Sequence, residues 1–204
     1  MTTDTQYRLG LYANGFVLGF VLMGFEMLSS RYLNPWFGSG IFTWAALISV
    51  TLFALMLGYY LGGMLVDRMP RAWVLGAALV AAAASMALTP MLIDPVIQSV
   101  MVNIGDGGGG VIAASLVILL VPLTIIAFYS PFCVRLLLRS VATTGRQTGA
   151  VYAINTMGNI LGTLVTSFVL IPSFGTRVIT YAFAVIVLLS AFWLIRLSRL
   201  EDAS

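Results

Sequence analysis

Two ionisable side chains interrupt an apolar stretch near the N-terminus. Glu26 is the only charged residue among residues 15–27, and Arg31 follows five positions later. Burying a charged side chain in hydrocarbon costs about 3 kcal/mol even on a lenient insertion scale, so Glu26 should face a wet cavity or a bundle interior. There it can carry a proton or balance a cationic substrate, and Arg31 can hold an anion. The structural alternatives are a Glu26 capped by Ser29 and Ser30 of the same helix, and an Arg31 extended to the membrane interface.

A second set of polar and small residues recurs at three- and four-residue spacing, which places it on one helix face. This set comprises Thr148, Tyr152, Asn155, Asn159, Gly162 and Thr166. Amides in a membrane helix need partners, so the face either lines a substrate pathway or joins helices, with Gly158 and Gly162 permitting close approach. Both interpretations stay open for Tyr152, Asn155 and Asn159, and also for Tyr129 and Ser130 of the preceding apolar run.

The composition requires these residues to lie in a membrane. The 204 residues are 60% hydrophobic and 8% charged, and the mean hydropathy is +1.04. So few polar side chains cannot cover a water-facing surface, which excludes a separate soluble enzyme domain. Strand-like alternation is absent, so helices must satisfy the backbone hydrogen bonds in lipid. We therefore expect an all-α integral membrane protein forming a single transmembrane domain over residues 1–204.

Apolar runs predict about six transmembrane helices, each long enough to cross a hydrocarbon core of about 30 Å. They cover roughly residues 10–33, 41–66, 73–93, 111–138, 149–171 and 178–195. All 10 basic residues are arginines, and all but Arg31 and Arg177 fall on the side of the termini. The positive-inside rule then predicts cytoplasmic N- and C-termini and an exported, mobile, glycine-rich loop over residues 94–110. Pro122 and Pro131 predict kinks in the fourth helix.

The chain is poor in two of the residue types that metal sites and nucleophilic enzymes use. The chain has no histidine and a single cysteine, Cys133, which leaves few sets for metal or nucleophilic catalysis. We expect no enzyme activity, no cofactor, no metal and no nucleic-acid partner. The segment GDGGGG, residues 105–110, is not expected to bind phosphate, because a phosphate loop joins a strand to a helix in a βαβ unit.

Two series of motifs resemble known families. GGMLVDRMPR, residues 62–71, resembles the signature between the second and third helices of major facilitator transporters, which implies a cytoplasmic gating motif of Asp67, Arg68 and Arg71. A longer series resembles the transmembrane portion of the membrane spermidine synthase-like family over residues 24–177. It consists of Glu26, Ser30-Arg31, Leu33, Pro35, Phe37-Gly38-Ser39, Trp44, LGYYLGG, the Asp67-Arg68 pair, Pro70, SPFCVR and GAVYAINTMGNILGTLVTSFVLIPSFGTR.

The resemblance places Glu26, Arg31, Asp67, Arg68, Asn155 and Asn159 in a family pattern without saying what they bind. Members of that family often fuse such helices to an aminopropyltransferase domain, and we expect this chain to lack one, since only residues 198–204 follow the last span. Six helices resemble half of a major facilitator transporter, whose two halves hold substrate between them. Similar segments at residues 57–63 and 160–167 hint at an inverted repeat of three plus three helices.

These observations lead to an expected function. We predict a small proton-coupled transporter for a polyamine or organic ion, with Glu26 and Arg31 as proton-coupling or substrate residues. A parallel homodimer in the lipid bilayer would rebuild a twelve-helix cavity. The expected location is a bacterial-type inner (plasma) membrane. The alternative is a non-transporting module that anchors or partners a separate aminopropyltransferase-like enzyme.

Overall fold

The protein is a bundle of long helices. The computed structural model describes residues 3–137 and 144–201, and this part contains no strand. Its elements are α1 (Thr3–Phe37), α2 (Ile41–Arg68), α3 (Ala72–Asn103), α4 (Gly108–Ala127), α5 (Tyr129–Leu137), α6 (Thr144–Val165), the π-helical segment η2 (Thr166–Leu170), α7 (Ile171–Ser173) and α8 (Thr176–Glu201). They form six apolar segments long enough to cross a membrane. The prediction of an all-helical protein with six membrane spans is confirmed.

The connection between the third and fourth spans is much shorter than predicted. Residues 94–103 continue α3, and α4 begins inside the glycine run, so only residues 104–107 join the two helices. The predicted end at Ile93 was wrong because Ile97 and Val100 extend the buried face of α3. This packing outweighs the backbone hydrogen bond that Pro95 cannot donate. The expectation of a long loop over residues 94–110 is therefore corrected.

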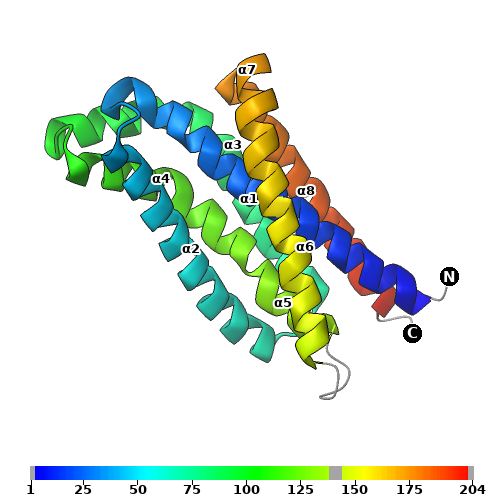
Figure 1. Ribbon diagram of the computed structural model, residues 1–204. Helices are drawn as coiled ribbons and strands as arrows, with labels where there is room; N and C mark the ends of the chain where they lie inside the picture. Colours follow the sequence, from blue (N-terminus) through cyan, green and yellow to red (C-terminus); the bar gives the residue numbers. More distant parts are fainter. Residues whose placement is uncertain (1–2, 138–143, 202–204) are drawn as a thin grey trace.

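The helices pair in a pattern with internal symmetry. The most extensive packing joins α1 with α6, α2 with α4, and α3 with α8, followed by α3 with α4 and α1 with α8 (Figure 1). The pattern stays the same when α1 is exchanged with α4, α2 with α6, and α3 with α8. The pair of α1 with α6 then becomes the pair of α4 with α2, and the pair of α3 with α4 becomes that of α8 with α1. Successive spans run in opposite directions, so the two sets of three are inverted relative to each other. The packing agrees with the inverted repeat of three plus three helices at which the sequence hinted.

Glycines make the two equivalent seams possible. In α6, Gly158 and Gly162 lie against backbone atoms of Phe16 and Phe20 of α1. In α2, Gly58 and Gly62 lie in the same way against Thr124 and Phe128 of the fourth span. A Cβ atom at any of these glycines would overlap the facing backbone. The glycines therefore let the helices pack closely together, which is the helix-joining interpretation of the sequence pattern.

The fourth span is interrupted where α4 meets α5. Pro131 has no N–H to donate to the carbonyl of Ala127, and the amide of Phe128 bonds to the carbonyl three residues back, Ile125 O at 3.1 Å, rather than to the one four residues back. This agrees with the predicted irregularity at Pro131, whereas α4 continues without interruption through Pro122. The break sets the direction of α5, which carries Tyr129 and Ser130 toward α1 and α6.

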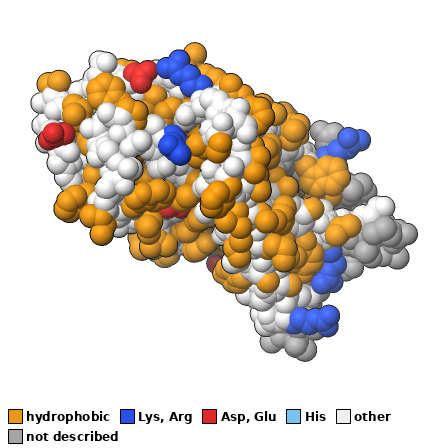
Figure 2. All heavy atoms as spheres, turned by 45° about the horizontal axis from the view of Figure 1, so that its top comes forward, with side chains coloured by type: hydrophobic (Ala, Val, Ile, Leu, Met, Phe, Trp, Pro, Cys, Tyr) orange, Lys and Arg blue, Asp and Glu red, His pale blue; other side chains and the backbone are white. Residues whose placement is uncertain are grey.

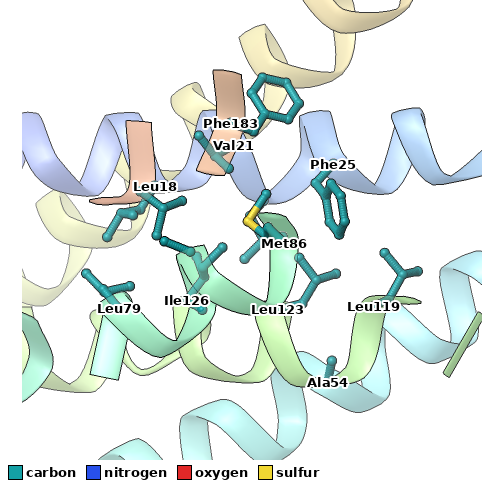
Figure 3. Close-up of a cluster of buried hydrophobic side chains, with 14 of the residues drawn as sticks. Leu18, Val21, Phe25, Ala54, Leu79, Met86, Leu119, Leu123, Ile126 and Phe183 are labelled. Atoms are coloured by element: carbon teal, nitrogen blue, oxygen red, sulfur yellow. The ribbon is translucent and has the colours of Figure 1, made fainter. Parts of the chain in front are cut away.

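Apolar side chains fill the centre of the bundle and cover most of its outside. Figure 3 shows Phe25 of α1 and Met86 of α3 among buried side chains of α4, with Phe183 of α8 nearby. Both chain ends lie at the same end of the bundle (Figure 1). Figure 2 shows orange hydrophobic surface over the middle, arginines at one end and mixed charges at the other. The arginines of the described residues at the end with the termini are Arg8, Arg68, Arg71, Arg135, Arg146, Arg196 and Arg199. Arg139, assigned to the same side, lies outside the described residues.

Candidate functional site

A polar cavity of about 370 Å³ lies at the end of the bundle opposite the termini. It is bounded by the last turns of α1, the first turn of α2, and the η2–α7 segment. Its lining residues are Met27, Ser30, Arg31, Asn34, Ser39, Thr43, Trp44, Ser167 and Ile171. A volume of this order suits a small ligand.

Local geometry explains why these residues converge. Met27, Ser30, Arg31 and Asn34 follow the three- and four-residue spacing that places side chains on one face of α1. Gly38, with φ +70, turns the chain sharply so that α2 folds back beside α1. The Thr43 hydroxyl then donates to Gly38 O at 2.9 Å, which ties the start of α2 to the end of α1.

The cavity is electropositive. Arg31 is its one charged lining residue, and the lining contains no carboxylate. Within the described residues, Arg31 forms no ion pair and no side-chain hydrogen bond. The other arginine at this end, Arg177, is paired with Asp94 at 3.1 Å. The guanidinium of Arg31 is therefore available to a ligand.

Glu26 is buried one helical turn from the cavity wall. Its side chain is 4% exposed, and Ser30 of the lining lies four positions later on the same face of α1. Thr51 of α2 packs beside the carboxyl, but its hydroxyl makes no hydrogen bond of good geometry. No arginine in the described ranges reaches Glu26. Burial of an uncompensated carboxyl in a membrane span is costly, which is typical of functional positions.

The structural alternative in which Ser29 and Ser30 cap Glu26 is not found. The Ser29 hydroxyl donates to Phe25 O at 2.7 Å, and the Ser30 hydroxyl donates to Met27 O at 2.7 Å. Each hydroxyl has one proton to donate, so neither is free to donate to Glu26. Both serines instead bond to the backbone of their own helix, a common alternative for serine in membrane helices.

The two asparagines on the polar face of α6 have different surroundings: Asn155 belongs to a polar cluster, and Asn159 packs against α1. Asn155 Nδ2 donates to Ser130 Oγ of α5 at 3.3 Å, and Tyr59 of α2 and Tyr152 lie close to this pair. These residues form a polar cluster between α2 and α6. Asn159 packs against Gly19 of α1, where its Oδ1 is buried without a hydrogen-bond partner.

Tyr129 packs inside the bundle rather than lining the cavity. It is 2% exposed, and its hydroxyl donates to the carbonyl of Leu11. Of the two roles left open for Tyr129, helix packing is the one that the structure shows.

The proposed gating motif lies far from the cavity. Asp67, Arg68 and Arg71 are exposed at the connection of α2 to α3, at the end that holds the termini. Asp67 makes no ion pair with the residues that the structure describes. The motif is thus separated from Glu26 by most of the length of α2.

Several lining residues were missed as site candidates. Asn34 was detectable, because it follows Arg31 at three-residue spacing on the same helix face. Thr43 and Ser167 carried no signal, since only the turn at Gly38 and the path of η2 bring them to Arg31. Asn14, also missed, donates to Ser190 O of α8 at 3.3 Å and joins helices.

Comparisons with protein-family models, curated proteins and solved structures find no match to this chain. Within the described residues, no group of three or more His, Cys, Asp or Glu side chains is arranged to hold a metal ion.

Proposed function

We propose that the protein is a small proton-coupled transporter of the plasma membrane that works as a parallel homodimer. The observation that carries the proposal is the cavity containing Arg31, which lies one helical turn from the buried carboxyl of Glu26. A bundle that only anchored another protein would gain nothing from a buried carboxyl without a cation. A transporter needs such a group, because a proton can bind and leave as access to water changes.

The lack of cover over α6 supports a dimer. In the fifth span, only Val151, Gly158, Gly162 and Thr166 are buried. Tyr152 is 48% exposed, and Asn155 beside it is half-buried. The Asn155 amide already donates to Ser130, but the hydroxyl of Tyr152 would lack a hydrogen-bond partner if it faced lipid. We call the surface that carries Tyr59, Tyr152 and Asn155 the α2–α6 face. A second copy placed against it would cover Tyr152 and the exposed part of Asn155, and would supply the missing half of a twelve-helix cavity.

Uptake into vesicles tests the proposal. Purified protein in liposomes with an alkaline interior should accumulate at least one labelled solute from a panel of lactate, succinate, phosphate, spermidine and amino acids. Accumulation should stop when a protonophore collapses the pH gradient, and protein-free liposomes are the control. Failure to accumulate any solute of this panel above the control would overturn the proposal.

A further inference from the structure

We propose that the cavity binds a small oxyanion, a carboxylate or phosphate group, between Arg31 and the N-terminus of α2. This inference rests on the proposed transport function and names the substrate class of the same site. It favours an organic or inorganic anion over a polyamine. Three features of the cavity support it independently.

The first feature is the charge of the lining. Arg31 contributes a guanidinium with five N–H donors in a planar fork, which matches two oxygens of a carboxylate or phosphate. No carboxylate in the lining competes for it. Asp94, at the same end of the bundle, is occupied by Arg177. A polyamine would meet only repulsion from Arg31, with no lining carboxylate to hold its ammonium groups.

The second feature is the start of α2, which forms one wall of the cavity. Its N-cap residue is Gly40, which provides no side-chain cap, and its first turn contains no acidic residue. The Trp44 amide bonds to Gly40 O at 3.3 Å. The three preceding amides, those of residues 41–43, therefore have no acceptor inside the helix. Together with the helix dipole they favour a negative charge at this position.

The third feature is the set of neutral donors around the cavity. The hydroxyls of Ser30 and Thr43 already donate to backbone carbonyls. Asn34, Ser39 and Ser167 make no side-chain hydrogen bond within the described part of the chain. Asn34, Ser39 and Ser167 can therefore donate to the anion oxygens that Arg31 does not reach. An oxyanion needs several donors because each of its oxygens carries more than one lone pair.

An oxyanion at this position has two sources, a free solute or the phosphate of a lipid headgroup, because the cavity lies at the end of the spans. Purified protein in a maltoside detergent, which has neither phosphate nor carboxylate, separates them. Thermal unfolding and calorimetry with lactate, succinate, inorganic phosphate and spermidine test free solutes, and added phosphatidylglycerol tests the lipid. We expect at least one soluble anion to raise the unfolding midpoint, and spermidine to leave it unchanged.

Substitutions at Arg31 locate the binding. Arg31→Gln should weaken binding of the effective anion by about tenfold or more, and Arg31→Lys by less, because lysine keeps the charge and loses the fork. Arg196→Gln is the matched control, since it removes one exposed positive charge at the far end of the bundle, outside any proposed site. Unchanged anion affinity in Arg31→Gln would overturn the inference.

Substitutions at Gly40 test the helix terminus separately. Gly40 has φ −73, and a side chain built there meets no atom within 4 Å. Gly40→Asp should cap α2 and raise the unfolding midpoint without ligand, while it weakens anion binding several-fold by occupying the free amides. Gly40→Ala is the uncharged control and should bind the anion normally. Normal anion affinity in a stabilised Gly40→Asp variant would contradict the role of this terminus.

The remaining outcomes separate this inference from the transport function. If spermidine binds and is accumulated while all anions are inert, the substrate class is wrong and transport stands. Anion binding that depends on Arg31, without uptake of any solute, leaves the oxyanion site and removes the transporter. Stabilisation by phosphatidylglycerol alone assigns the site to a lipid headgroup and rejects a soluble substrate.

Discussion

Glu26 and Arg31 are close in sequence but have different surroundings. Glu26 is enclosed between α1 and α2 with Thr51 beside it, whereas Arg31 lies on the cavity wall without an ion pair in the described ranges. Two residues that are five positions apart on a helix point in different directions, so the charges of Glu26 and Arg31 do not neutralise each other. One carboxyl is thus available for a proton and one guanidinium for an anion.

The burial of Glu26 should reduce the stability of the protein. Glu26→Gln keeps the shape and removes the charge, so we expect the free energy of unfolding to rise by on the order of 1 kcal/mol near neutral pH. Thermal unfolding in detergent measures the change. Asp67→Asn is the matched control, because it removes an exposed carboxyl, and should shift the midpoint little. A Glu26→Gln variant that unfolds earlier than the parent would show a structural carboxyl.

Side-chain chemistry in the site was predictable where one helix supplies it. Glu26, Arg31 and the Asn155 face follow from polar residues in apolar runs and from helical spacing. Partners across helices were not predictable, because the contact of Asn155 with Ser130 depends on the break at Phe128. The convergence of Ser39, Thr43 and Ser167 on Arg31 depends likewise on the turn at Gly38.

At the level of helices, two glycine seams hold equivalent pairs together. Gly58 and Gly158 both face backbone atoms of the neighbouring helix, so alanine at either position must push the helices apart. We expect Gly58→Ala and Gly158→Ala each to lower the free energy of unfolding by about 1–3 kcal/mol. Denaturant or thermal unfolding compares the variants with the parent.

Gly63 is a matched control on the same helix as Gly58. A Cβ at Gly63 meets no atom within 4 Å, so Gly63→Ala should be neutral or slightly stabilising through helix propensity. If all three alanine variants behave alike, the seams do not depend on close backbone approach.

Helix existence was easier to predict than helix ends. Each of the six apolar runs forms a span, because length and hydropathy suffice for that decision. The end of α3 was misplaced because Asp94 and Pro95 are local stop signals, whereas tertiary packing of Ile97 and Val100 continues the helix. The inverted repeat was only hinted at by similar segments and becomes clear from the helix pairs.

For the molecule as a whole, the distribution of arginine predicts its orientation. Arginines concentrate at the end with the chain termini, so this end should be cytoplasmic and residues 104–107 should be exported. A Gly108→Cys change in a Cys133→Ala background should react with a membrane-impermeant maleimide added to intact cells. Gly145→Cys, near the opposite end, should react only after the membrane is opened. The reverse pattern would show that the orientation is inverted.

Assembly follows from the uncovered polar face. We expect a homodimer in mild detergent and in lipid nanodiscs, because a second copy would cover Tyr152 and Asn155 on the α2–α6 face. Native mass spectrometry measures the mass directly. A monomer that retains solute uptake would remove the twelve-helix arrangement and leave the six-helix bundle as the working unit.

Proton-coupled accumulation by the parent and by Glu26→Gln, reconstituted side by side, tests the central claim most directly. Both proteins should bind the same solute and exchange it across the membrane. The parent should accumulate the solute against its gradient when the vesicle interior is alkaline, and the variant should not, because glutamine cannot carry a proton. Accumulation by the variant equal to that of the parent would contradict the account.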